Sequence, residues 1–372
     1  MKIGILTITP NIGYGGIMQA YALQYILQQQ GHEVFLLNRK TKYSLFKKLL
    51  IFLKRFIKKY LYGKDIALTL NKEYTFISQN TEPFLQKYIR RTSDIYTTNE
   101  LSETAQQGFE AFVVGSDQVW RPKYVPDIYN YYLDFLKEDR NIKRIAYAAS
   151  FGTDKWEYSA DEENKCLMLI QQFDAVSVRE RSAVGLCEKH FDVSPDLVLD
   201  PTLLLPKSIY LNLIKNNNSV AELDMFTYIL DMNDDKRKMI KQIQQNLGLE
   251  LFEFNTNGEN REAPLSERIA PSVESWIYGF SSAKYIVTDS FHGCAFSIIF
   301  NKPFLVYGNI ERGLSRFTSL LGLLNLDDSP IPSTYEITSN RLTAPINWEE
   351  VNQIIMRKQE DSLHFLKNSL VN

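Results

Sequence analysis

The order of apolar and polar positions at the start of the chain predicts a strand, a helix and a second strand. Lys2–Ile8 is an apolar run rich in β-branched residues, which is typical of a buried strand. After the turn Asn11–Gly16, apolar residues recur at helical spacing through Ile17–Gln30, and Gly31 ends this helix. Val34–Leu37 is the next apolar run. A strand–helix–strand unit predicts a parallel sheet with helices on its faces.

Further apolar runs extend this pattern along the chain, and polar residues follow each of the first four. These four are Ala111–Val114, Arg144–Ala149, Ala175–Val178 and Leu197–Leu199. Ligands bind at the carboxyl ends of strands in open parallel sheets, so the polar residues that follow are candidates for a site.

A second series of elements begins after Pro206 and the polar segment Lys215–Ser219. It comprises strands at Met225–Leu230, Glu250–Phe254, Tyr285–Asp289 and Phe304–Tyr307, with helices at Asp235–Leu247, Ser272–Gly279 and Cys294–Phe300. We therefore predict an α/β protein with two Rossmann-like αβα domains, residues 1–205 and 206–345, that face a cleft. A last helix, 348–370, could pack back on the first domain.

One segment combines concentrated positive charge with an amphipathic pattern. Ten basic residues and no acidic ones lie between Arg39 and Lys64. Near residues 44–62 most apolar side chains share one face of a helix, and the other face carries Lys47, Lys48, Lys54, Arg55, Lys58 and Lys59, with Ile51 among these cations. This pattern favours a helix on an anionic membrane surface. The alternative is a helix packed on the sheet with a solvated lysine face.

The overall composition limits the function classes. The chain has 372 residues, 44% hydrophobic and 23% charged, with a net charge of −2, which fits a globular protein and argues against nucleic acid as a partner. The cysteines Cys166, Cys187 and Cys294 have no metal-ligand spacing, so no metal is predicted. No signal peptide and no apolar stretch of ~18 residues is apparent. We expect a cytoplasmic protein, associated peripherally with the inner face of the cell membrane.

Two turns of the first half are candidate binding segments. Asn11–Gly16 could direct backbone N–H groups, with Asn11, Gly13 and Tyr14, at a ligand, or it could be a tight turn that needs glycine. It matches neither dinucleotide nor P-loop motifs. In the second turn, Ser116, Asp117 and Gln118 could bind sugar hydroxyls and Trp120 could stack on a sugar, or Asp117 could cap a helix while Trp120 is core.

The segment Thr288–Gly293 is the strongest catalytic candidate, because a strand ends there and an apolar helix begins. It places His292 near a helix N-terminus, where imidazole could act as general acid or base, with Asp289 close in sequence. Pairing of Cys294 with His292 as a nucleophile is a weaker alternative. Arginines that could bind phosphate or carboxylate, or form surface pairs instead, are Arg179, Arg181, Arg312 and Arg316.

In these segments the sequence resembles the polysaccharide pyruvyl transferase family. The matching segments are Asn11–Gly16, Met18–Gln24, Val114–Trp120, Val176–Glu180, Asp200–Thr202, Val287–Gly293, Asn301–Phe304 and Arg316-Phe317. The resemblance implies a two-domain fold of the glycosyltransferase-B type. It also implies transfer of the enolpyruvyl group of phosphoenolpyruvate to a sugar hydroxyl pair, which closes as a cyclic ketal.

The resemblance also implies roles for individual residues. His292 would be the catalytic acid, Arg179 and Arg316 would bind phosphoenolpyruvate, and Arg312 is a less secure match than Arg316. Ser290 and Gly293 would also contact the donor. Many relatives have arginine where this chain has Ser290, so either part of the donor site comes from elsewhere or the donor differs. Phosphoenolpyruvate would be a co-substrate without a further cofactor. The acceptor would be a glycan or lipid-linked sugar precursor of a surface polysaccharide.

Two other functions stay open on the sequence. One is a glycosyltransferase of the same architecture that uses a nucleotide sugar, although no acidic motif for ribose is evident in the second half. The other is a non-catalytic assembly factor for polysaccharide at the membrane. Binding of phosphoenolpyruvate or of a nucleotide sugar distinguishes these functions.

Overall fold

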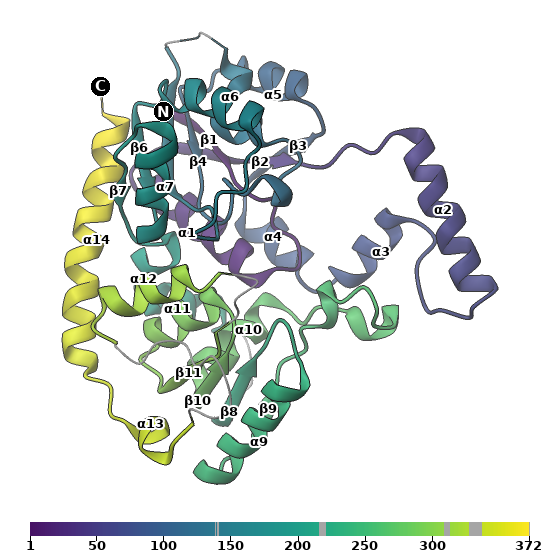
Figure 1. Cartoon of the computed structure of the whole chain (residues 1–372), viewed down its shortest axis with the longest axis vertical. Coiled ribbons are helices and arrows are strands. Elements are labelled where there is room, and N and C mark those ends of the chain that lie inside the picture. The colour runs from purple at the N-terminus through teal and green to yellow at the C-terminus, as the bar shows by residue number, and fades with distance from the viewer. Residues whose placement is uncertain (138, 140, 216–220, 309–312, 327–336, 372) are drawn as a thin grey trace.

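The chain forms two parallel β-sheets, each with helices packed around it (Figure 1). The computed structural model describes residues 1–137, 139, 141–215, 221–308, 313–326 and 337–371. Every strand pairing within this part of the chain is parallel. Parallel neighbours need crossover segments, and the helices between the strands supply them.

The first sheet has seven strands in the order β3-β2-β1-β4-β5-β6-β7. Its strands are β1 Lys2–Leu6, β2 Glu33–Arg39, β3 Arg91–Ile95, β4 Ala111–Val114, β5 Lys143–Ala149, β6 Ala175–Val178 and β7 Asp196–Leu197. The helices of this half are α1 Tyr14–Gln29, α2 Leu45–Tyr60, α3 Leu70–Ile77, α4 Glu82–Tyr88, α5 Thr98–Ala105, α6 Ala160–Ile170 and α7 Arg181–Phe191, with 3-10 turns η1 Pro122–Tyr124, η2 Ile128–Tyr132, η3 Asp134–Leu136 and η4 Pro201–Leu204.

The second sheet has four strands in the order β11-β10-β8-β9. Its strands are β8 Leu223–Tyr228, β9 Leu251–Glu253, β10 Ala283–Thr288 and β11 Phe304–Val306. The helices of this half are α8 Lys207–Leu213, α9 Asp234–Leu247, α10 Val273–Ser282, α11 Phe291–Ile299, α12 Ser315–Leu323 and α13 Ser339–Thr343, with 3-10 turns η5 Asn257–Glu259 and η6 Leu265–Arg268.

The last helix, α14 Trp348–Leu370, follows the second sheet in sequence but contacts the first half of the chain. The Ser362 hydroxyl accepts a hydrogen bond from the backbone N–H of Leu199 at 3.0 Å, and the Gln359 side chain donates to the carbonyl of Leu203 at 2.6 Å. Figure 1 shows this helix along the side of both halves. Its apolar face, with Val351, Leu366 and Leu370, is buried.

Aromatic side chains join the two halves in one buried cluster. The ring of Tyr14, on α1, stacks on the indole of Trp276, on α10, with centroids 5.6 Å apart and an interplanar angle of 4°. The Tyr14 hydroxyl donates to the carbonyl of Pro271 at 2.8 Å. Trp276 is fully buried and also contacts Phe296 of α11. Such pairs stabilise the interface beyond their buried area, so the halves pack tightly here.

The structure differs from the sequence prediction mainly where polar segments form regular structure. The edge strand β3, Arg91–Ile95, has only one buried residue, so it lacks the apolar run that marks the central strands. Helix α11 begins at Phe291 rather than at Cys294, which places His292 in its first turn. Within the described part of the chain, no helix is both long and apolar enough to span a bilayer.

Candidate active site

The candidate site lies where the carboxyl ends of β4, β6 and β7 meet the start of α11. Asp117 follows β4, Arg179 follows β6 and Asp200 follows β7. His292, from the second half, reaches this group: its Nε2 lies 3.7 Å from Oδ2 of Asp200. The site therefore joins side chains from both sheets, at the strand ends where open α/β sheets bind ligands.

The turn between β10 and α11 fixes the position of His292. The Ser290 hydroxyl caps α11 by accepting a hydrogen bond from the backbone N–H of Gly293 at 3.3 Å. A Cβ atom on Gly293 would lie 2.2 Å from Oγ1 of Thr288, so only glycine allows this close turn. Both Ser290 and Gly293 thus shape the backbone beside the imidazole.

The imidazole of His292 is enclosed by the first half of the chain. A Cβ atom on Gly15, in the first turn of α1, would lie 2.0 Å from Nδ1 of His292. The absence of a side chain at Gly15 therefore makes room for the ring. His292 is buried, and its Nε2 has no hydrogen-bond partner within the described residues. Nε2 is also the ring nitrogen nearest Asp200, so a ligand that contacts it must enter beside that carboxylate.

Asp200 lies at the centre of the polar contacts around His292. Its Oδ2 accepts hydrogen bonds from Nη1 of Arg179 at 2.7 Å and from the Ser116 hydroxyl at 3.0 Å. Its Oδ1 accepts from the backbone N–H and the hydroxyl of Thr202, at 3.0 and 2.7 Å. Burial alone would raise the pKa of Asp200, but His292, Arg179 and Thr202 outweigh it and hold that pKa well below its ordinary value. Asp200 therefore carries a negative charge beside the imidazole.

The guanidinium group of Arg179 is held by three carboxylates. It contacts Asp200, Oδ1 of Asp117 at 3.2 Å and Oε2 of Glu180 at 3.7 Å. Burial lowers the pKa of Arg179, but these carboxylates raise it by more, so its pKa lies above the ordinary value. The Asp117 side chain is 17% exposed, whereas the side chains of Asp200 and Glu180 are fully buried. Asp117 is therefore the partner on the open side of Arg179.

Glu180 is held by the loop after β5. Its Oε1 accepts hydrogen bonds from the Ser150 hydroxyl at 2.8 Å and from the backbone N–H of Phe151 at 3.1 Å. Burial nevertheless raises the pKa of Glu180 above its ordinary value, although Arg179 and these donors oppose the shift. Glu180 therefore adds a carboxyl group whose charge is destabilised by burial.

Arg316 of α12 adds a second guanidinium group to the site. Phe291 lies between the two arginines, with its ring centroid 4.8 Å from Cζ of Arg179 and 5.6 Å from Cζ of Arg316. Burial and the positive charge of Arg179 lower the pKa of Arg316 to about 10. The carboxylates of Asp117 and Glu180 oppose this shift. Arg316 therefore adds positive charge to a group in which Arg179 is already paired with carboxylates.

The structure corrects the catalytic role predicted for Asp289. Its carboxylate is buried and accepts hydrogen bonds from Nζ of Lys236 at 2.6 Å and from the backbone N–H groups of Leu230 and Asp231 at 2.7 and 3.2 Å. These contacts tie β10 to the loop after β8 and to α9. Asp289 is therefore a structural residue of the second half.

Two predicted acceptor contacts are also corrected. Trp120 is fully buried, stacks on Tyr132 with centroids 5.2 Å apart, and donates from Nε1 to the carbonyl of Tyr131 at 3.1 Å. Tyr14 is buried in the aromatic interface with Trp276. Both aromatic rings belong to the core, so Trp120 cannot stack on a sugar and the side chain of Tyr14 is not exposed for acceptor binding.

The other predicted residues lie in several places. Asn11, Gly13 and Gln118 are partly exposed, and Nη1 of Arg121 donates to Oε1 of Gln118 at 3.1 Å. Ser116 is buried between Asp200 and Arg179. Arg312 lies outside the described residues. Cys294 is fully buried and burial raises the pKa of its thiol, which disfavours a nucleophilic thiolate.

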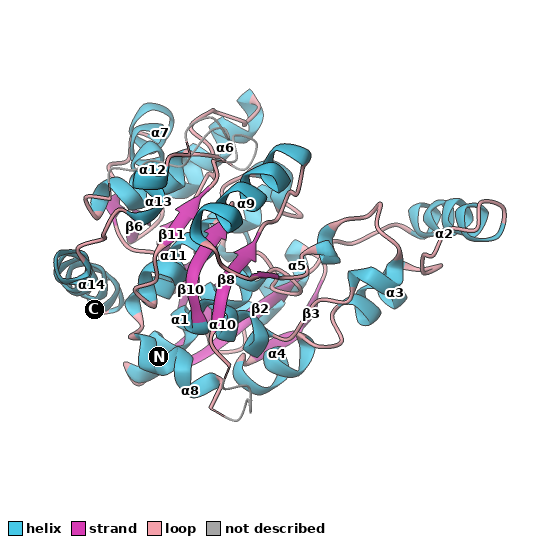
Figure 2. Cartoon of the chain, turned by 90° about the horizontal axis from the view of Figure 1, so that it is seen from below, coloured by secondary structure: helices cyan, strands magenta, loops and turns pink. Residues whose placement is uncertain are grey.

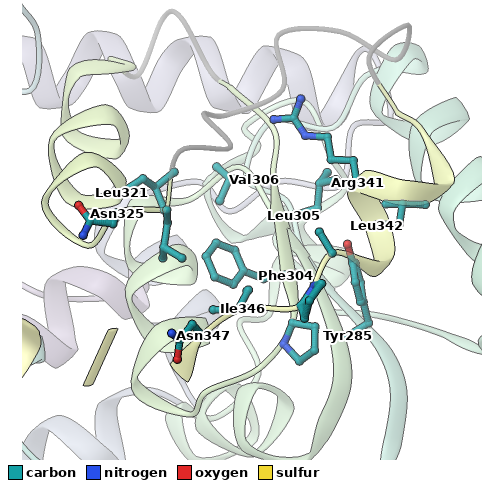
Figure 3. Close-up of a pocket in the computed structure, with 14 residues that line it drawn as sticks. Tyr285, Phe304, Leu305, Val306, Leu321, Asn325, Arg341, Leu342, Ile346 and Asn347 are labelled. Atoms are coloured by element: carbon teal, nitrogen blue, oxygen red, sulfur yellow. The ribbon is translucent and has the colours of Figure 1, made fainter. Parts of the chain in front are cut away.

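A small recess lies between the two halves of the chain, and a larger cavity lies away from the candidate site. A small recess between the two halves is lined by the loop Ile12–Tyr14 and by Tyr228, Thr256 and Glu259. A larger cavity of about 290 Å³ lies beside β11 and α13, lined by Tyr285, Phe304, Leu321 and Arg341 among others (Figure 3). None of the predicted site residues that the structure describes lines the larger cavity. Among the described residues, no three His, Cys, Asp or Glu side chains are placed so that they could hold a metal ion.

Comparison with known proteins identifies the family. A family model described as polysaccharide pyruvyl transferase matches residues 14–311. The chain belongs to the polysaccharide pyruvyl transferase family. The match includes Gly15, Arg179, Asp200 and His292, whereas Arg316 lies beyond it. Membership of this family supports a transferase of polysaccharide biosynthesis. No curated protein matches the chain in sequence.

Solved structures similar to this member of the family show its fold type. UDP-GlcNAc 2-epimerase from Neisseria meningitidis, bound to UDP-GlcNAc, aligns with a TM-score of 0.52 and 10% identity over 100% of this chain and 95% of that chain. The Methanocaldococcus jannaschii UDP-GlcNAc 2-epimerase, in complex with UDP-GlcNAc and UDP, aligns with a TM-score of 0.50 and 12% identity over 99% and 100%. The predicted glycosyltransferase-B-like fold of two Rossmann-like domains is thereby confirmed.

The site also contains residues to which the sequence analysis gave no role. Asp200 is within the family-like segment Asp200–Thr202, and its position after a short strand was the available signal. Gly15 and Phe291 act through close contacts that no local pattern reveals.

The buried charge of Asp200 leads to a stability prediction. We expect Asp200→Asn to lower the free energy of unfolding by about 3–5 kcal/mol, because it leaves the buried Arg179 without its shortest ion pair. Urea unfolding monitored by circular dichroism measures this. The folded-state pKa of Asp200 lies below the ordinary 3.8, so the stabilisation is present above about pH 4 and decreases below it. A difference between the variant and the wild type that stays constant as pH falls below 4 would contradict this role.

Proposed function

We propose that this protein transfers the enolpyruvyl group of phosphoenolpyruvate to two hydroxyls of a sugar and closes a cyclic ketal. The observation that carries the proposal is the position of His292. It lies 3.7 Å from Asp200, which binds the buried Arg179, and it follows Phe291, whose ring lies near both Arg179 and Arg316. An acid next to cationic groups suits an anionic substrate that must be protonated. Family membership supports pyruvyl transfer.

The two arginines would bind the anionic groups of the donor. Arg316 supplies a positive charge whose lowered pKa of about 10 still keeps it protonated near neutrality. On Arg179, the phosphate or carboxylate of phosphoenolpyruvate would replace Asp117, its only partly exposed carboxylate partner among the described residues. Guanidinium groups bind both anions in bidentate geometry, which orients the donor as well as neutralising it.

His292 would act as the general acid. Protonated imidazole donates a proton to the methylene carbon of phosphoenolpyruvate, which becomes a methyl group and leaves an oxocarbenium-like centre at C2. The negative charge of Asp200 stabilises the imidazolium before this transfer. Asp200 is thus a positioning residue that acts through His292.

The remaining steps balance protons and bonds. One sugar hydroxyl attacks C2 and loses its proton, the C2–O bond to phosphate breaks, and the second hydroxyl attacks and loses its proton. Of the two hydroxyl protons, one restores imidazolium at His292 and the other leaves with phosphate. The partly exposed Asn11, Gly13, Asp117 and Gln118 are the candidate acceptor contacts that remain.

Donor binding gives the first test. We expect phosphoenolpyruvate to raise the melting temperature of the protein and UDP-GlcNAc to leave it unchanged, because a ligand that binds only the folded state stabilises it. Thermal shift titrations measure both ligands in parallel. Stabilisation by UDP-GlcNAc alone would favour a nucleotide-sugar transferase, and stabilisation by neither would favour a non-catalytic assembly factor.

A substitution at Arg316 tests donor recognition. We expect Arg316→Gln to raise the KM for phosphoenolpyruvate about 10-fold or more, with partial recovery in Arg316→Lys, because lysine restores charge without the planar fork. Steady-state kinetics of phosphate release measure this. The matched control is Arg181→Gln. Arg181 is an exposed arginine that follows β6, two residues after Arg179. An equal change of KM in both variants would exclude a specific role for Arg316.

A further inference from the structure

Helix α2 extends away from the rest of the molecule, with α3 between it and the two halves. Both views show this separation (Figures 1 and 2). None of the α2 side chains is buried. The apolar residues are exposed to an unusual degree for large hydrophobic groups: Phe46 is 70% exposed, Leu49 54%, Leu53 46% and Phe56 45%. A contiguous apolar surface of this kind marks an interaction site.

The charge on the opposite face of α2 identifies the kind of partner. Lys47, Lys48, Lys54, Lys58 and Lys59 lie on α2, which contains no acidic residue. Among the described residues, none of these five lysines forms an ion pair with a carboxylate. Lys47 lies over the ring of Tyr43 at 5.1 Å, and Lys59 interacts with Asp65 only through its charge at longer range. One helix thus presents ammonium groups without close carboxylate partners beside an exposed apolar face. This combination complements an anionic lipid surface, where acyl chains cover the apolar side chains and headgroups meet the lysines.

Arg55 has a different role from the one its position in the cationic segment predicted. Its guanidinium forms an ion pair with Glu73 of α3 and donates to the carbonyl of Ala67 at 2.9 Å. Glu73 also forms an ion pair with Arg268 of η6. Arg55 therefore anchors α2 to α3 and, through Glu73, to the second half, and it is removed from the predicted membrane contacts.

The anchor of α2 leads to the loop expected to bind the acceptor. Arg268 donates to the carbonyl of Gly258 at 3.1 Å, and a Cβ atom on Gly258 would lie 3.2 Å from Cδ1 of Ile12. After α3, the Thr81 hydroxyl donates to the carbonyl of Asn11 at 2.8 Å. A continuous set of contacts thus connects α2 with the loop Asn11–Tyr14.

We propose that α2 binds an anionic lipid bilayer and holds the Asn11–Tyr14 side of the molecule near that surface. The helix lies in the headgroup region with its apolar face towards the acyl chains, and the ion pairs of Glu73 set the orientation of the rest of the protein. An acceptor sugar carried on a membrane lipid would then reach the site from the bilayer. Only this last step rests on the proposed function.

Vesicle flotation of the full chain tests the helix. We expect the wild type to float with vesicles of phosphatidylcholine mixed with phosphatidylglycerol, and not with phosphatidylcholine alone. Replacement of all five lysines by glutamine is expected to lower the partition coefficient about 100-fold or more, since each cation contributes several-fold. The matched control is expected to bind like the wild type. It replaces by glutamine five exposed cations outside α2, which are Lys189, Arg237, Lys238, Lys241 and Lys367.

A second variant tests the apolar face of α2. A melting curve of each variant checks that it folds. Leu49→Ser/Leu53→Ser/Phe56→Ser is expected to lose vesicle binding while it keeps all five lysines. Equal binding by the five-lysine variant and its control would overturn the proposal. Self-association of the wild type without lipid, abolished by the serine variant, would instead assign the face to a second copy. Flotation needs no turnover, so its outcome does not depend on whether pyruvyl transfer occurs.

Discussion

The His292→Gln variant is expected to release phosphate from phosphoenolpyruvate about 10³–10⁴-fold more slowly than the wild type at saturating substrate. Glutamine keeps hydrogen-bonding capacity in a similar volume but cannot supply a proton to the methylene carbon. Asp200, the carboxylate beside the ring, is held ionised by Arg179 and Thr202. Glu180, whose pKa is raised by burial, is fully buried against Arg179, so we expect neither carboxyl group to replace the imidazole as proton donor. Single-turnover kinetics with phosphoenolpyruvate and the acceptor measure the chemical step directly.

The control for this experiment is His364→Gln. His364 is an exposed histidine of α14 that contacts Asn368, so its replacement changes the same residue type far from the site. We expect His364→Gln to retain wild-type turnover and thermal stability. Wild-type turnover in folded His292→Gln would show that the imidazole is not the proton donor.

The second large effect is expected from the addition of one methyl group, in Gly15→Ala. The new Cβ would lie 2.0 Å from Nδ1 and 2.5 Å from Cγ of His292, so the whole ring must move. A displaced imidazole loses its alignment with Asp200 and with the donor, and misplacement by about 1 Å reduces rates by about 100-fold. We expect kcat to fall by about that factor while the KM for phosphoenolpyruvate changes little.

Gly16→Ala is a closely matched control. Gly16 is the next residue of α1, and its Cβ would lie 3.9 Å from Oδ2 of Asp117, which is ordinary van der Waals contact. Both substitutions replace glycine by alanine in the first turn of one helix, so their backbone effects are similar. Equal loss of activity in both variants would mean that the helix, and not the contact with His292, causes the effect.

Much of the fold could be predicted because its central strands are buried on both faces. Such strands are short apolar runs, and the polar residues that follow them mark the edge where the site lies. β3 escaped prediction because an edge strand with polar residues needs no apolar run. Helix α2 was evident from the separation of its basic residues from all its apolar residues except Ile51.

The candidate site could be predicted only in part, because burial and pairing depend on distant residues. Asp289 resembles a catalytic neighbour of His292 in sequence, yet Lys236, 53 residues away, holds it elsewhere. Trp120 follows a strand end like a binding residue, but Tyr132 and Tyr131 enclose it. The role of Asp200 depends on Arg179 and His292, which come from other elements and meet at its carboxylate, so no local pattern around Asp200 predicts it.

Mass spectrometry of the acceptor tests the central claim most directly. Wild-type protein is incubated with phosphoenolpyruvate and glycolipids in deuterium oxide, and the products are fragmented. We expect one glycolipid to gain the mass of pyruvic acid less one water, with a single solvent deuterium in the new methyl group. Two results would contradict proton transfer to phosphoenolpyruvate in this site. One is a glycolipid that gains the pyruvate ketal without deuterium in its methyl group, and the other is a glycolipid that gains a sugar from a nucleotide donor instead.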